Sequence, residues 1–173
     1  DKDASLFPRR FGERYAVIHR PIIRGEADIW IAFSPDLKHW GDHRILLPTR
    51  DGQWDCHRVG LGAQPIETPE GWLIIYHGVR TTAAGGIYRV GLALLDLEDP
   101  RRIRRRSDEW VFGPSEDYEM LGDTPHVTFP TGAILDKESN ELRVYYGAAD
   151  TTVALATADM GRLMDYVMAC PEP

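Results

Sequence analysis

The chain has 173 residues, of which 43% are hydrophobic and 27% charged, as in one ordinary globular domain and unlike a disordered or fibrous chain. Twenty basic against 27 acidic residues give a formal net charge of −7, which disfavours a general affinity for nucleic acid. No apolar run approaches the length of a membrane span, so we expect no membrane partner either.

Three similar pairs of strands are predicted along the chain. In order, they cover residues 14–20 and 28–34, 71–78 and 88–95, and 141–147 and 152–157. Each pair joins a strand rich in β-branched and aromatic residues to a second strand rich in small residues. The pairs begin near Tyr15, Trp72 and Leu142, so the repeat is 57 and then 70 residues long. This spacing fits propeller blades with loop insertions.

The fold class predicted from these elements is all-β. Alternating small residues, such as Gly91 and Ala93, suit the inner strands of propeller blades, which converge on a crowded axis. A β-sandwich uses similar strands, so the residues by themselves leave both architectures open. Residues 159–168 fit either a short helix or an outer strand.

We describe residues 1–173 as one partial domain with repeats near residues 11–57, 58–115 and 125–170. Three blades do not close a ring, and open sheet edges invite pairing with another chain. The expectation is therefore that upstream blades are missing or that a second copy completes the assembly.

Cys56 and Cys170 are too few for a disulfide framework, which favours a reducing, cytoplasmic setting. The six histidines show no HExxH or CxxC type of ligand spacing, so we expect no metal site. Two charged segments are set aside. Glu116, Asp117 and Glu119 are expected to be structural or at most near a substrate, and the arginines between residues 101 and 106 to form a solvated loop.

Seven segments carry a family resemblance. They are Trp30–Trp40, Gly60–Ile66, Gly71–Gly78, Tyr88–Gly91, Leu94–Pro100, Glu116–Glu119 and Tyr145–Asp150. Their order resembles the C-terminal half of glycoside hydrolase family 130, the β-mannoside phosphorylases and related β-mannosidases. The resemblance runs from about Phe11 to the end of the chain.

The resemblance implies a five-bladed β-propeller, of which this chain holds about three blades, with the active site in the axial funnel. It implies inverting phosphorolysis of a β-mannoside, such as mannosyl-glucose or a β-manno-oligosaccharide, to α-mannose 1-phosphate. Inorganic phosphate is then the co-substrate, without a further cofactor. The catalytic aspartate is expected upstream of residue 1. The alternatives are a related β-mannosidase and a non-catalytic, sugar-binding partial propeller.

The resemblance also implies a phosphate site. Arg58 stands where the family has a phosphate-binding cation, commonly lysine, and His77 and Tyr88 match other phosphate ligands. Arg20 is the fourth expected ligand, with Arg14 as its rival. Cations and hydroxyl donors must converge on a phosphate dianion for this chemistry. Without the family, these residues are ordinary surface, turn and strand residues.

Two further residues are expected at the sugar. Asp150 matches the aspartate that holds mannosyl hydroxyl groups, although an aspartate is also common at the start of a turn. His126 replaces an asparagine found in many relatives and is expected at or near the funnel. If the acid instead lies within this chain, Asp28, Asp36 and Asp55 are the candidates.

Overall fold

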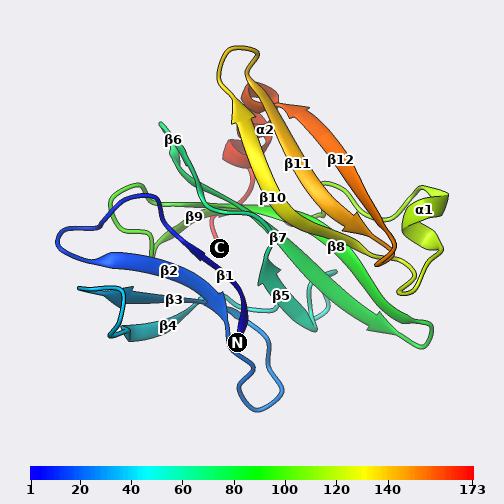
Figure 1. The fold of residues 1–173 in the computed structure, drawn as a ribbon, viewed down its shortest axis with the longest axis horizontal. Coiled ribbons are helices and arrows are strands. Elements are labelled where there is room, and N and C mark those ends of the chain that lie inside the picture. Colours follow the sequence, from blue (N-terminus) through cyan, green and yellow to red (C-terminus); the bar gives the residue numbers. More distant parts are fainter.

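The computed structural model describes residues 1–173 as three antiparallel sheets (Figure 1). The first contains, in order, β1 (Lys2–Leu6), β2 (Tyr15–Arg20), β3 (Ile29–Ser34) and β4 (Gly41–Leu47). The second contains β5 (Arg58–Leu61), β7 (Gly71–Thr82), β8 (Gly85–Leu95) and β9 (Ile103–Arg106), with β6 (Ile66–Thr68) also paired to β7. The third contains β10 (Thr128–Asp136), β11 (Glu141–Ala148) and β12 (Thr152–Asp159).

Strand order confirms the all-β prediction, and the structure adds β1, β4, β5, β6, β9 and β10 to the six strands predicted. Neighbouring strands follow one another along the chain in each sheet, as in propeller blades. The first sheet begins with β1, which lies before the repeat expected from residue 11. Its sequence, Lys-Asp-Ala-Ser-Leu, has no apolar alternation that predicts a strand.

The second sheet lies between the other two (Figure 1) and contributes both of its faces to the core. Side chains alternate between the faces of a strand, so the apolar run of β7 divides into two sets. Trp72, Ile74 and Tyr76 pack with residues of the first sheet. Leu73 and Ile75 pack with residues of the third sheet and the C-terminal helix. A strand buried on both faces explains why β7 is so continuously hydrophobic.

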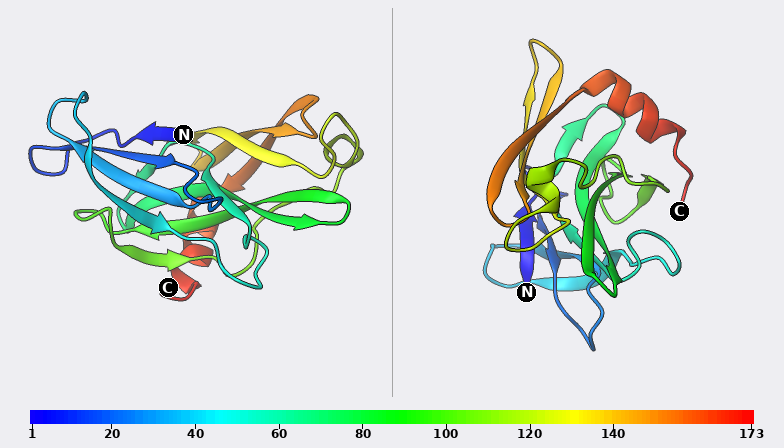
Figure 2. Two further views of the ribbon diagram at one scale, coloured as in Figure 1. Left: turned by 90° about the horizontal axis from the view of Figure 1, so that it is seen from below. Right: turned by 90° about the vertical axis from the view of Figure 1, so that its right-hand side faces the viewer.

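The C-terminal segment is a helix and not an outer strand. Helix α2 covers Met160–Ala169, and the side chain of Asp159 caps it by accepting a hydrogen bond from the Arg162 backbone N–H at 2.8 Å. Beyond α2 the chain returns to β9, where the Arg106 N–H donates to the Pro171 carbonyl (Figure 2). A second helix, α1 (Asp117–Met120), is one turn long. Neither helix has the length and apolar character needed to cross a membrane.

Candidate functional site

A buried charged cluster lies where β1, β2 and β7 meet. Arg20 ends β2, is only 6% exposed, and places its Nη2 atom 3.2 Å from Oδ2 of Asp3. His77 of β7 is fully buried, with Nε2 3.6 Å from the same oxygen and 3.5 Å from Nη1 of Arg20. Nζ of Lys2 lies 3.6 Å from the other oxygen of Asp3. Two strands of the first sheet, β1 and β2, and strand β7 of the second sheet therefore meet here.

The backbone geometry of β1 determines where the Asp3 side chain points. Asp3 has a φ of 53°, in the left-handed region, and the pairing of β1 with β2 is irregular between Lys2 and Ser5. A bulge of this kind redirects side chains, and a left-handed residue other than glycine costs about 1 kcal/mol or more. Together the bulge and the left-handed φ determine the direction in which the Asp3 side chain leaves β1.

Gly60 makes room for the cluster. A Cβ atom at this position would lie 2.3 Å from Oδ2 of Asp3 and 2.4 Å from Cε1 of His77. Any side chain there would displace the carboxylate or the imidazole. The glycine of the Gly60–Ile66 segment is thus required by the site and not by a turn.

Several polar atoms of the cluster lack a hydrogen bond. Oδ2 of Asp3, Nε of Arg20 and Nδ1 of His77 are buried without a hydrogen-bond partner. Native proteins rarely leave buried polar atoms without a hydrogen bond, so their concentration in one place marks the cluster as a candidate polar site. Burial, followed by the charges of Arg20 and Lys2, lowers the pKa of His77 to about 3. Its imidazole is therefore neutral near pH 7 and offers one N–H donor.

The other expected phosphate ligands share one sheet face with His77. Gly60 pairs with His77 across β5 and β7, and Arg58 pairs with Val79, which in turn pairs with Tyr88. Directly paired residues project to the same side of an antiparallel sheet. Arg58, His77 and Tyr88 are thus on one face in two adjacent rows, and Arg58 is exposed.

Aromatic rings line the same place. The Tyr88 ring centroid is 5.8 Å from that of His77, and the Phe129 ring lies 4.4 Å from His77 and 6.2 Å from Tyr88. Nζ of Lys2 lies 5.4 Å from the centre of the Phe129 ring. By contrast, Arg14 is remote from these rings, because it pairs with Asp42 and stacks on Phe33. Of the two rival arginines, only Arg20 lies in the cluster.

The two residues expected at the sugar lie in neighbouring loops. The His126 carbonyl accepts a hydrogen bond from the Tyr88 N–H at 3.1 Å, which joins this loop to the start of β8. Asp150 is exposed in the turn after β11 and accepts a hydrogen bond from the Thr124 hydroxyl at 2.6 Å. Both residues have left-handed backbone, with φ of 63° for His126 and 55° for Asp150. The loop containing Thr124 and His126 therefore connects Asp150 to Tyr88.

Glu119 stabilises the loop that precedes His126. It is 3% exposed, and its carboxylate accepts hydrogen bonds from the backbone N–H groups of Ser115 and Glu116 and from the Tyr146 hydroxyl. Its own burial opposes ionisation, but the Glu116 and Tyr146 hydrogen bonds outweigh it and lower the pKa of the carboxyl group. The ionised side chain fastens the loop before His126 to β11.

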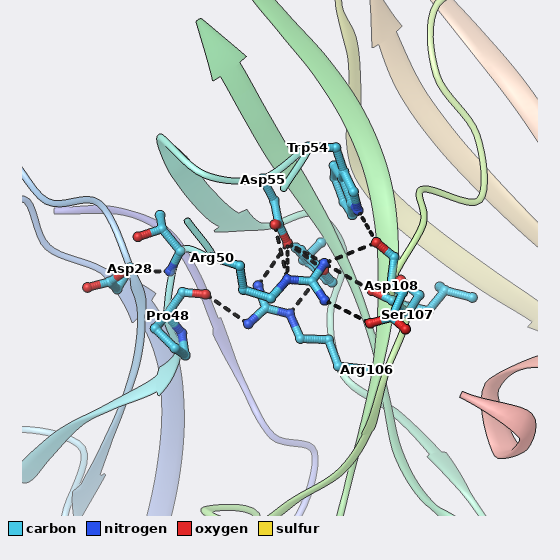
Figure 3. A network of polar contacts seen from close by, with 11 residues as sticks. Asp28, Pro48, Arg50, Trp54, Asp55, Arg106, Ser107 and Asp108 are labelled. Carbon is cyan, nitrogen blue, oxygen red and sulfur yellow. Dashed lines mark hydrogen bonds and ion pairs between the residues drawn. The ribbon is translucent and has the colours of Figure 1, made fainter. Parts of the chain in front are cut away.

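The candidate acids within the chain are committed to the fold. Asp28 accepts the Thr49 N–H, and Asp36 accepts the N–H groups of Lys38 and His39. Asp55 is fully buried in the network of Figure 3, where Arg50, Arg106 and the Tyr76 hydroxyl all bind its Oδ2 at 2.9–3.0 Å. None of the three carboxylates takes part in the cluster around Arg20 and His77.

The same network corrects the interpretation of the basic run. Arg106 is 3% exposed, and besides Asp55 it binds the carbonyl of Pro48 at 2.8 Å. Residues Ile103–Arg106 form β9, so the basic run is not a solvated loop throughout. Side chains alternate along β9, so the Arg106 side chain points inward. There it binds Asp55, which lies in a loop 51 residues earlier in the chain.

Sequence reasoning missed Lys2 and Asp3. Both belong to the short β1 strand, and no spacing to another polar residue marks them. Their closeness to Arg20 follows from the pairing of Lys2 with Arg20 across β1 and β2. Recognition of β1 as a strand is the only signal that would have found them.

Comparison with known proteins finds a family model and several relatives that match most of the chain. Residues 1–169 match a family model described as beta-1,4-mannooligosaccharide phosphorylase. A β-1,4-mannooligosaccharide phosphorylase of Ruminococcus albus is 37% identical over 96% of this chain and 50% of the relative. A β-1,2-mannobiose phosphorylase of Listeria innocua is 46% identical over 89% of this chain and 42% of the relative.

A solved structure agrees with these matches. The Listeria innocua β-1,2-mannobiose phosphorylase in complex with β-1,2-mannobiose superposes with a TM-score of 0.88 at 42% identity. The match covers 96% of this chain and 46% of that one. The chain thus spans about half the length of the curated relatives it matches.

Proposed function

The chain belongs to glycoside hydrolase family 130, and we propose that it supplies the phosphate site and part of the sugar site of a β-mannoside phosphorylase. The family fold is a five-bladed β-propeller, so the three sheets are blades of a partial ring and the sandwich alternative is excluded. The relatives are named for phosphorolysis of β-1,2- and β-1,4-linked mannosides.

The observation that carries the proposal is the preformed cluster of Arg20 and His77. A permanently charged guanidinium and a neutral N–H donor, both buried and both with an unpaired nitrogen, suit an oxyanion. Tyr88 adds a hydroxyl donor, and Lys2 and Arg58 add positive charge at the exposed side. Asp150 and His126 lie in the connected loops, where we propose that they contact the mannosyl unit.

In the proposed reaction, a phosphate oxygen forms a bond to the anomeric carbon as the bond to the glycosidic oxygen breaks. Attack from the face opposite the leaving group inverts the configuration and gives α-mannose 1-phosphate. Arg20, Arg58, His77 and Tyr88 hold the phosphate for this attack and reduce its entropic cost. The departing oxygen takes a proton from a general acid.

We place that acid outside residues 1–173. The carboxylates of Asp28, Asp36, Asp55 and Glu119 are bound within the fold, and Asp3 contacts the phosphate ligands, on the side of the nucleophile. General acid catalysis is typically worth about 10²–10⁴-fold in rate. We therefore expect little or no turnover from these residues alone. Turnover near that of an intact relative would place the acid within this chain.

The test is to supply a longer protein containing these residues with β-1,2- and β-1,4-mannobiose in parallel, with and without inorganic phosphate. Phosphorus NMR would detect mannose 1-phosphate, and the anomeric coupling would report its configuration. Phosphate-dependent release of the α-anomer is expected. Free mannose formed at an equal rate without phosphate would instead identify a hydrolase.

The hydrolase is the alternative worth testing because a solved relative, 27% identical with a TM-score of 0.76, is described among glycoside hydrolases of this family that target β-1,2-mannosidic linkages. The cations and hydroxyl donor around Arg20 favour phosphate over water as the nucleophile.

We further propose inorganic phosphate as the co-substrate without another cofactor. A cytoplasmic location is supported by Cys56 and Cys170, which are both free thiols.

A further inference from the structure

Asp3 is an unexpected residue for an anion site. Its side chain is only 5% exposed, and Oδ2 points between Arg20 and His77 without a hydrogen bond. A carboxylate here opposes the attraction of the cations for a negatively charged ligand. Nη2 of Arg20 forms an ion pair with this oxygen at 3.2 Å, but without hydrogen-bond geometry, and a buried acceptor without a hydrogen bond is costly.

The chain holds Asp3 in this place by three separate features. Its backbone is left-handed, the strand pairing beside it is irregular, and Gly60 leaves the space that its Oδ2 occupies. An ion pair with Arg20 needs none of these, because Asp99 and Arg101 form one in an exposed turn with no such arrangement. The carboxylate is therefore directed into the site.

The hydrogen bond that Oδ2 lacks can come from one class of ligand. Inorganic phosphate near neutral pH keeps at least one proton, and its P–O–H group can donate to a carboxylate. Sulfate has nearly the same size and geometry but carries no proton. An ionised carboxylate only accepts hydrogen bonds, so sulfate would place an oxygen against it with no proton between them.

We propose that Asp3 is a specificity-determining residue that selects protonated oxyanions, phosphate and arsenate, over sulfate. The inference rests on the proposed phosphate site and adds to it the origin of its selectivity. Arg20, Arg58 and Lys2 attract any oxyanion by their positive charge. Asp3 disfavours an oxyanion that has no proton to donate in a hydrogen bond to its carboxylate. Sites built around a hydrogen bond discriminate strongly against a ligand that lacks its half of the bond.

The experiment is a calorimetric titration of the 173-residue chain with phosphate, arsenate and sulfate at pH 7 and constant ionic strength. We expect phosphate and arsenate to bind alike and sulfate roughly 100-fold more weakly, as follows from leaving a buried charged acceptor opposed. In Asp3→Asn the amide can donate to sulfate, so the preference for phosphate should fall by about 10-fold or more. Asparagine also tolerates the left-handed backbone.

The matched control is Asp42→Asn. Asp42 has the same left-handed backbone, with a φ of 53°, and pairs with Arg14 in the same sheet, away from the cluster. It should keep the wild-type preference, and thermal unfolding should show both variants folded. Equal wild-type binding of phosphate and sulfate, or a preference unchanged in Asp3→Asn, overturns the inference but leaves the phosphate site standing. No phosphate binding by the wild-type chain overturns both.

Discussion

At the scale of single residues, the exposed Arg58 and the buried Arg20 are the two arginines of the proposed phosphate site, and they differ in how they can be tested. Arg20 also pairs with Asp3, so its removal leaves a buried carboxylate alone and disturbs folding. Arg58 forms no ion pair and lies at the first position of β5. Its removal is therefore the cleaner test of charge in the site.

We predict that Arg58→Ala weakens phosphate binding by about 1.5–3 kcal/mol, the usual range for a hydrogen bond to a charged group. The fold should be unaffected, because the side chain is exposed. Titration calorimetry measures the affinity. Arg143→Ala, which removes an arginine from the third sheet, is the control and should bind phosphate as the wild type does. Unchanged affinity in Arg58→Ala would remove this residue from the site.

His77 gives a prediction about pH. Its pKa of about 3 in the folded chain lies below the usual 6.5, mainly because of burial. Between these values the unfolded state binds a proton that the folded state does not, so stability falls as the pH is lowered from 6.5 towards 3. The contribution of one such group is up to about 1.4 kcal/mol per pH unit.

Urea unfolding at a series of pH values between 7 and 4 would measure this slope. His77→Gln should flatten it. The same slope in wild type and His77→Gln would show that the imidazole is protonated in the folded chain. Phosphate binding should show no titration of His77 between pH 5 and 8.

At the scale of elements, the Asp55 network fixes the loop between the first two blades. Asp55 holds Arg50 of the same loop and Arg106 of β9, while Trp54 donates to the Asp108 carbonyl at 2.8 Å (Figure 3). Arg58, the first residue of β5, follows Asp55 by three residues. The network thus determines where β5 begins and where Arg58 is presented.

We predict that Asp55→Ala lowers the free energy of unfolding by about 3–5 kcal/mol, because it leaves the buried Arg106 without its anion and removes one of the two anions that the half-buried Arg50 contacts. Denaturant unfolding measures the loss. Asp99→Ala removes a partly exposed pair with Arg101 and should cost about 1 kcal/mol or less. A comparably small effect of Asp55→Ala would mean that the network is replaceable by water.

At the scale of the whole molecule, the third sheet has one uncovered face. Tyr145 pairs with Leu155 across β11 and β12, and Val153 and Ile134 project to the same side. These four side chains are 37–80% exposed. Apolar side chains gathered on one blade face are typical of a surface that packs against another blade.

We therefore predict self-association of the 173-residue chain through its open blade faces. Sedimentation velocity and native mass should give a dimer. Leu155→Glu should shift the equilibrium to the monomer, because it places a charge in the apolar patch. A stable wild-type monomer of 19.6 kDa at high concentration would contradict this prediction.

The strands and the family could be predicted from the sequence because their signals are local. The β7 segment is rich in β-branched and aromatic residues and hydrophobic on both faces, which is typical of a strand buried on both sides. The ordered segments from Trp30 to Asp150 indicated the family. His77 and Tyr88 were predicted from the same motifs, and their roles in binding phosphate stay predictions.

Tertiary structure decided what depends on distant segments. Propeller and sandwich strands look alike in sequence, and only the order of pairing and the packing of three sheets separate them. The solvated-loop interpretation failed at Arg106 because its anion, Asp55, is far away in the chain. Lys2 and Asp3 were missed for the same reason. A charged residue reveals its purpose only when folding brings its partners within a few ångströms, and here Gly60, Arg20 and His77 come from three different strands.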